Sequence, residues 1–137
     1  MKDAYYFPHD SNSQYDDKIS MIRLEFGWAG YGLFFAIIEK LRDCPGYRWS
    51  SDAQAGLAAS LTDAQTTLEY VTKVYARLLS LKLIIDDGKW IFSQSLIDRM
   101  IKIDERRQRL IESGRLGGIA SSIAQASLKQ PSSRKGK

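Results

Sequence analysis

The chain has 137 residues, enough for one domain with a modest core, and its 44% hydrophobic and 26% charged residues are ordinary for a soluble globular protein. No apolar run approaches the length of a membrane span, and no apolar segment near Met1 indicates a signal peptide. The single cysteine, Cys44, excludes an internal disulfide and fits a reducing compartment. We therefore expect a cytoplasmic protein without a membrane partner.

The net charge of +4 is unevenly distributed along the chain. Residues 1–100 contain 11 Lys and Arg against 13 Asp and Glu, whereas residues 101–137 contain 9 against 3. A basic tail on a nearly neutral domain is a candidate arm for nucleic acid.

Residues 1–15 are predicted to form an N-terminal arm, aromatic at first and then polar. Pro8 favours extended backbone at Phe7, and the aromatic side chains are expected to lie on the domain. His9 is the only histidine, and the sequence has no Cys/His cluster that could bind a metal. We expect a packing or capping role for His9, no metal and no cofactor.

Two helices are predicted next, from position 16 or 17 to Phe26 and from about residue 30 to 43. Gly27 is suited to end the first helix, and the sequence Cys44-Pro45-Gly46 ends the second. Residues 47–50 could form a short strand that pairs with a later hairpin, and an Ala-rich helix is predicted over 51–61.

Residues 62–92 combine a helix, for which Thr62 is the predicted N-cap, with a hairpin. The apolar face of this helix consists of Leu68, Val71, Val74, Tyr75, Leu78 and Leu79. Asp87-Gly88 predicts a two-residue turn. A helix followed at once by a hairpin is typical of the second half of a winged helix-turn-helix. The alternative is a helix packed on any small sheet.

The predicted turn pairs Ile85 with Trp90 and Ile84 with Ile91. Strand alternation then places Leu83, Ile85, Trp90 and Phe92 on one face, which we expect to be the core face. Ile84 and Ile91 would form the opposite face, and the N-terminal arm or a partner chain would cover them. They are the predicted interface residues.

A last helix is predicted to begin after Ser93 or Ser95 and to end near Gly114. Its first half is expected to pack on the domain and its second half to project, with a basic cluster at Arg106, Arg107 and Arg109. The predicted organisation is an arm at 1–15, a winged-helix domain with the extended helix at 16–116, and a basic disordered tail at 117–137. The fold class is mostly α with a small β-hairpin.

Several short segments of the sequence resemble an N-terminal domain of phage and prophage proteins. They are Tyr6-Phe7-Pro8-His9-Asp10, Asp17-Lys18-Ile19, Gly27, Gly30-Tyr31-Gly32, Glu39, Ser93 to Leu96, Arg106-Arg107, Gly114 to Gly118 and Ala120-Ser121. That family is similar to DnaD-like primosome proteins and phage replisome organisers. The resemblance implies a winged-helix domain in replication initiation, often followed by a second helical domain, and no catalytic residues. Lys82 departs from it, since glycine is expected there.

The face of the 62–80 helix opposite its apolar side is predicted to carry Thr66, Tyr70, Lys73 and Arg77. In a winged helix this stripe would enter the major groove, and Lys89 at the hairpin tip would meet a phosphate. We therefore predict a DNA-binding module. Because no phosphate-binding loop, zinc spacing or nucleophile motif is present, we expect this module to be non-enzymatic. The alternative is an assembly module that binds itself or another replication protein. No small-molecule substrate is evident.

Overall fold

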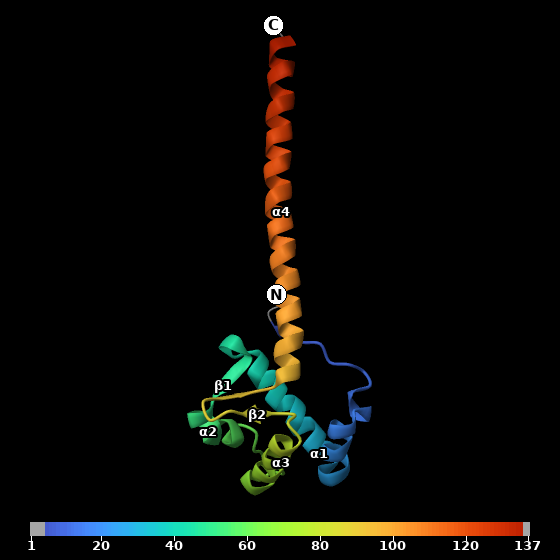
Figure 1. The fold of residues 1–137 in the computed structure, drawn as a ribbon, viewed down its shortest axis with the longest axis vertical. Coiled ribbons are helices and arrows are strands. Elements are labelled where there is room, and N and C mark those ends of the chain that lie inside the picture. The colour runs from blue at the N-terminus through green and yellow to red at the C-terminus, as the bar shows by residue number, and fades with distance from the viewer. Residues whose placement is uncertain (1–4, 136–137) are drawn as a thin grey trace. The chain divides into compact units, whose positions relative to one another are not determined.

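The structure is a computed structural model that describes the backbone of residues 5–135 and the side chains of residues 5–125. The chain divides into two compact units, Met1–Met100 and Ile101–Lys137, which are described separately below. The fold is mostly helical, with a small three-stranded antiparallel sheet and a long C-terminal helix (Figure 1).

Short 3-10 turns, α-helices and short strands follow one another along the chain. They are the 3-10 turn η2 (Ser13–Tyr15), helix α1 (Asp17–Arg42), turn η3 (Pro45–Tyr47), strand β1 (Arg48–Ser50), turn η4 (Ser51–Ala53), helix α2 (Gln54–Ala59), helix α3 (Leu68–Ser80), strands β2 (Ile85–Asp86) and β3 (Trp90–Phe92), and helix α4 (Gln94–Lys135). The short strand predicted at 47–50 is confirmed as β1, and it pairs with β3.

Helix α1 is two helical segments joined at Gly27, where the backbone takes φ 71° and ψ −168°. This left-handed geometry favours glycine, so the predicted break at Gly27 is confirmed. The Asp16 carboxylate caps the first segment by accepting the N–H groups of Lys18 and Ile19. By length and composition alone α1 could cross a membrane, although no segment of such length was predicted from the sequence. Its buried side chains, such as Ile37, nevertheless form part of the core of the first unit.

The sheet has the strand order β1-β3-β2. Ile85 pairs with Phe92 and Asp86 with Ile91, so every partner lies two positions further along β3 than we predicted. The cause is the turn, which is centred one residue later than Asp87-Gly88: the Asp87 N–H donates to the Trp90 carbonyl at 3.1 Å. The Asp87 carboxylate also accepts the N–H groups of Lys89 and Trp90, which stabilises the turn at this shifted position.

The predicted orientation of the hairpin is wrong. Ile84 and Ile91 are fully buried, whereas Leu83, Ile85, Trp90 and Phe92 are all only half-buried. The grouping of these residues on two faces was correct, because a register shift of two preserves alternation. The face that packs inward is the opposite one. Ile84 and Ile91 are therefore core residues and cannot serve as an interface.

Helix α3 begins at Leu68, six residues after the predicted N-cap Thr62. The cap is Thr67, whose hydroxyl accepts the N–H of Tyr70 at 3.2 Å. Thr62 instead donates its hydroxyl to the Ala59 carbonyl at the end of α2. Within α3, the buried positions are Val71, Val74, Tyr75 and Leu78, while Leu68 is 53% exposed.

The N-terminal arm is tied to the first unit by polar and aromatic contacts. The Arg42 Nε donates to the Tyr6 carbonyl at 2.5 Å, and Arg99 binds the Asp10 carboxylate at 2.8 Å. The His9 ring stacks on Phe35 with a centroid distance of 3.9 Å and an interplanar angle of 9°. A packing role for His9 is thus confirmed.

The second unit consists of the continuation of α4 beyond Met100. Residues 117–135, which we predicted to be disordered, are helical, and the glycines at 114, 117 and 118 lie within the helix. Every side chain from position 108 to 125 is exposed. This part of α4 therefore buries no face of its own among the described side chains.

Candidate nucleic-acid interface

The predicted DNA-binding stripe lies mostly on α3, so the rotation of that helix decides which side chains reach solvent. The buried residues Val71, Val74 and Leu78 define the core direction. At about 100° per residue, Tyr70 and Arg77 fall about a quarter turn from that direction, and Glu69 and Lys73 fall opposite to it. The stripe is therefore divided between two sides of the helix.

Tyr70 is occupied in holding α3 against α1. Its phenolic hydroxyl donates a short hydrogen bond to the Phe26 carbonyl, and its ring meets the Phe26 ring edge to face at 6.0 Å. The side chain is half-buried. Tyr70 is a packing residue in this structure and is not on the exposed face.

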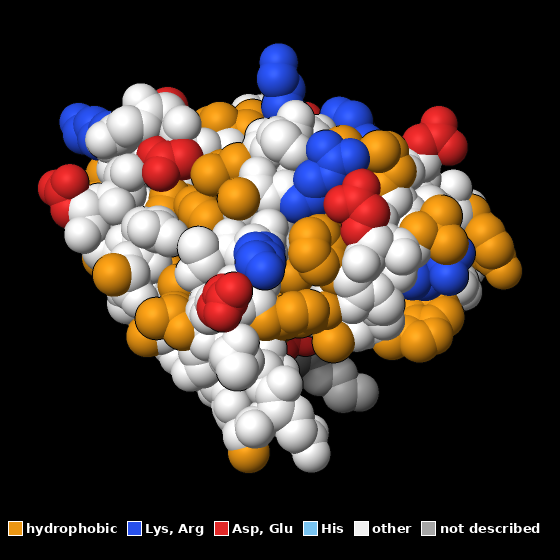
Figure 2. All heavy atoms as spheres, turned by 90° about the horizontal axis from the view of Figure 1, so that it is seen from below, with side chains coloured by type: hydrophobic (Ala, Val, Ile, Leu, Met, Phe, Trp, Pro, Cys, Tyr) orange, Lys and Arg blue, Asp and Glu red, His pale blue; other side chains and the backbone are white. Residues whose placement is uncertain are grey.

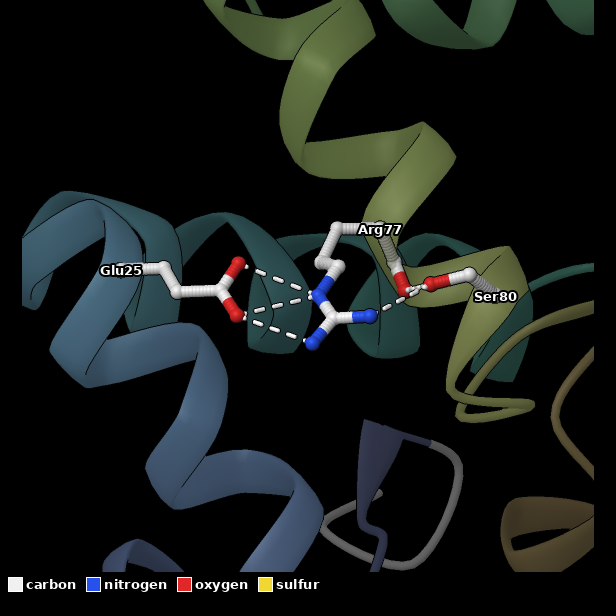
Figure 3. A network of polar contacts seen from close by, with 3 residues as sticks. All are labelled: Glu25, Arg77 and Ser80. Atoms are coloured by element: carbon white, nitrogen blue, oxygen red, sulfur yellow. Dashed lines mark hydrogen bonds and ion pairs between the residues drawn. The ribbon is translucent and has the colours of Figure 1, made fainter.

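Arg77 is also directed toward α1. Its guanidinium makes a two-pronged contact with the Glu25 carboxylate, with nitrogen–oxygen distances of 2.9 and 3.1 Å, and donates to the Ser80 hydroxyl at 3.1 Å (Figure 3). Bidentate pairing of this kind satisfies both the charge and the donors of the guanidinium. Arg77 is therefore a link between helices, and its predicted DNA contact would require this pair to break. Nothing in the sequence links Glu25 to a residue 52 positions away.

Lys73 does lie on the exposed side of α3. Its ammonium group lies 3.3 Å from the Glu69 carboxylate, and both side chains are well exposed. Such a pair one helical turn apart is weak and exchanges readily with solvent or a ligand. Thr66 precedes α3 in a turn, where its N–H and carbonyl both bond to Asp63. Of the four stripe residues, Lys73 alone presents a cation on the outer side of α3.

Lys89 lies on the exposed turn between β2 and β3, as predicted. Its N–H donates to the Asp87 carboxylate, and its carbonyl accepts the Ser51 N–H. Hydrogen bonds from the N–H groups of Trp90 and Lys89 lower the pKa of Asp87, so this carboxylate remains ionised beside Lys89. The turn therefore presents a cation and an anion together.

Three arginines in the second unit form the remaining predicted site. Arg106 and Arg109 are exposed on α4. Arg107 is half-buried and already interacts with another group of the protein. Further along the helix Arg115 is paired with Glu112 at 2.5 Å, which raises the pKa of the guanidinium and lowers that of the carboxyl. The cluster at 106–109 has no such paired carboxylate at Arg106 or Arg109 among the described side chains.

The space-filling view of the molecule from below shows single basic side chains, several of them beside acidic ones, between hydrophobic side chains (Figure 2). Large exposed hydrophobic side chains of the first unit include Leu24, Trp28 and Leu68. This mixture is unlike the continuous basic surface of a strong phosphate binder.

No group of three or more His, Cys, Asp or Glu side chains is placed to hold a metal ion within the described part of the chain. The cysteine has a raised pKa, because burial and then Asp43 disfavour its thiolate, so it is poorly suited to act as a nucleophile at neutral pH.

The first unit therefore defines a class of small, mostly helical domain with a three-stranded antiparallel sheet. Residues 6–96 match the family model described as Lin1244/Lin1753-like, N-terminal, which covers well over half of the chain. The chain belongs to this family. No curated protein and no solved structure matches it.

Proposed function

We propose that the chain is a winged-helix module that binds DNA without catalysis and serves in the replication initiation of a phage or prophage. The observation that supports a winged helix is the order α1-β1-α2-α3-β2-β3 combined with the sheet order β1-β3-β2. In a winged helix, α3 is the recognition helix and the β2–β3 turn is the wing. The replication role follows from the sequence resemblance to DnaD-like primosome proteins and replisome organisers.

The proposed contacts differ from those read from the sequence. Tyr70 and Arg77 are engaged with α1, so Lys73 on the outer side of α3 and Lys89 at the turn are the proposed contacts of the first unit. The arginines at 106 and 109 add phosphate contacts from the second unit, where the residues beyond 100 hold 9 Lys and Arg against 3 Asp and Glu. Such contacts favour sequence-independent, salt-sensitive binding.

The test is the affinity of the full chain for duplex DNA, measured by fluorescence anisotropy over a series of salt concentrations. Replacing Arg106 and Arg109 together by Gln should lower the slope of log K against log salt by about 2, because each phosphate contact contributes about one released counterion. Arg115→Gln is the matched control on the same helix, since Glu112 already neutralises that guanidinium. Lys73→Gln should weaken binding further. An absence of duplex binding by the full chain at low salt would overturn the proposal.

A second function, assembly with a copy of the same chain, is favoured by the apolar side chains exposed on α4. These are Leu110, Ile111, Leu116, Ile119 and Ile123, which are 45–64% exposed. Leu116, Ile119 and Ile123 follow the three- and four-residue steps of a helix seam. Sedimentation of the full chain and of a Leu116→Lys, Ile123→Lys variant distinguishes this function, because a self-associating parent should become monomeric in the variant.

A further inference from the structure

A cleft with a volume of about 640 Å³ lies within the first unit, between the N-terminal arm, α1 and the beginning of α4. Its lining includes Phe7, His9, Phe35, Lys18, Lys82 and Arg99. Clefts of several hundred Å³ that combine apolar walls with a few polar groups are the usual sites for small ligands. This cleft shares no residue with the proposed duplex contacts.

The apolar wall of the cleft is built from flat rings. His9 stacks on Phe35 at 3.9 Å, and Phe7 lies nearly parallel to His9 at an angle of 16° and a centroid distance of 6.4 Å. His9 is exposed, whereas Phe7 and Phe35 are half-buried, so part of the His9 ring remains accessible from solvent. Stacked, accessible aromatic rings are suited to hold a planar base.

Some charged side chains that line the cleft already have a partner among the described residues, and others do not. Asp10 is paired with Arg99 at 2.8 Å, and the Asp16 carboxylate caps α1. Lys18 and Lys82 are exposed and form no ion pair with any residue that the structure describes. Asp17 is the remaining carboxylate on the lining. Lys18 and Lys82 thus supply two cationic side chains without an ion-pair partner in the described part of the chain, which an anionic ligand can bind, beside the three carboxylates of the lining.

Lys82 occupies a backbone position that its side chain disfavours. Its φ is 61°, in the left-handed region, where glycine is free of steric cost and a long side chain is not. The position joins α3 to the hairpin, and glycine would make this junction more easily. Residues held in such conformations are often found where a side chain contacts a ligand. Lys82 also lines the cleft, which gives a reason for lysine at this position.

We propose that this cleft binds a nucleotide, either a free mononucleotide or an unpaired nucleotide of a single strand. The base stacks on the exposed part of the His9 ring that Phe35 does not cover, and the phosphate is bound by the ammonium groups of Lys82 and Lys18. Arg99 stays paired with Asp10 and holds the arm that forms one wall. The lining of the site shares no residue with α3 or with the duplex contacts proposed above.

Isothermal titration calorimetry of the full chain with dAMP, inorganic phosphate, oligo(dT) and duplex DNA tests the site. Lys82→Gly and Lys82→Asn remove the ammonium and relieve the left-handed position, so the melting temperature should stay equal or rise. Affinity for dAMP and oligo(dT) should fall about tenfold, as expected when one hydrogen bond to a charged group is lost. Lys102→Ala, which removes an exposed charge in the second unit, is the control and should leave the affinity for dAMP unchanged.

The four titrations separate the outcomes. Binding of dAMP that depends on Lys82 and is weakened by His9→Ala supports the site, and tighter binding of oligo(dT) than of dAMP identifies the single strand as the source of the nucleotide. Phosphate binding equal to that of dAMP would overturn the stacking of a base. Absence of dAMP and oligo(dT) binding at about 1 mM, or binding unchanged by Lys82→Gly, would overturn the proposal even if duplex DNA binds.

Discussion

The hydroxyl of Tyr70 in α3 donates to the carbonyl of Phe26, the last residue before the break in α1. This bond joins residues 44 positions apart and lies at the point where the helical backbone of α1 is interrupted at Gly27. The pair therefore fixes α3 against α1 at the break.

Replacing Tyr70 by Phe removes only the hydroxyl of this pair. The free energy of unfolding should fall by about 1 kcal/mol, and by more if the Phe26 carbonyl stays dry, because a part-buried acceptor then loses its donor. Tyr15→Phe is the matched control, since the Tyr15 side chain is 73% exposed. Equal stability of the two variants in urea unfolding would show that the Tyr70 bond contributes nothing.

Two neighbouring isoleucines provide a test of the hairpin orientation. Ile84 is fully buried and Ile85 is half-buried, so Ile84→Ala should cost about 2–5 kcal/mol. Ile85→Ala should cost about 1 kcal/mol, because less apolar surface returns to water. Chemical denaturation of both variants measures the difference. A larger loss for Ile85→Ala would restore the orientation predicted from the sequence.

Tyr75 should make the stability of the first unit depend on alkaline pH. Burial, with a smaller effect of Asp86, raises the pKa of Tyr75 to about 12, and its hydroxyl has no hydrogen-bond partner among the described residues. The unfolded chain loses this proton near pH 10, whereas the folded chain keeps it up to about pH 12. The free energy of unfolding therefore keeps its full value below pH 10 and falls as the pH rises to 12. The parent should therefore lose on the order of 2 kcal/mol relative to Tyr75→Phe over this range.

The measurement is the free energy of unfolding of both proteins in urea from pH 8 to pH 11.5. Below pH 10 the Tyr75→Phe protein should be as stable as the parent or more stable, because the buried hydroxyl is unsatisfied. A difference between the two proteins that stays constant with pH would mean that Tyr75 ionises as freely in the folded state as in the unfolded one.

Ending the chain after Gly114 should leave the melting temperature nearly unchanged. All described side chains beyond this position, residues 115–125, are exposed, so their removal takes no packing from the first unit. The shortened chain should bind duplex DNA with a smaller salt dependence, since Lys129, Arg134, Lys135 and Lys137 are gone. Calorimetry and anisotropy measure the two effects. A fall of many degrees would assign a structural role to the removed residues.

Local signals in the sequence predicted the features that depend on neighbouring residues. Gly27 marked the break in α1 because its backbone conformation favours glycine. The sequence also located β1 and the hairpin along the chain, although the register of the hairpin was wrong by two residues. Thr62 and Thr67 are equally good N-caps, so composition could not decide where α3 begins. Strand alternation sorted the hairpin into two faces but could not say which one the helices cover.

The candidate site was harder to predict, because its charges are settled by contacts between distant segments. A helical wheel places Arg77 near the edge of the exposed side, and only the position of Glu25 shows that the guanidinium is engaged. Lys82 gave the opposite kind of signal. An unexpected lysine at a position suited to glycine was visible in the sequence, and its meaning depended on the cleft.

The small size of the sheet has a consequence for the behaviour of the protein at high concentration. Both edge strands are very short, three residues in β1 and two in β2, and β1 begins with the charged Arg48. Long, flat, apolar edges recruit strands from other molecules, and these edges are too short to do so. Aggregation by strand addition should therefore be slow in the folded protein, so that loss of soluble material would report unfolding.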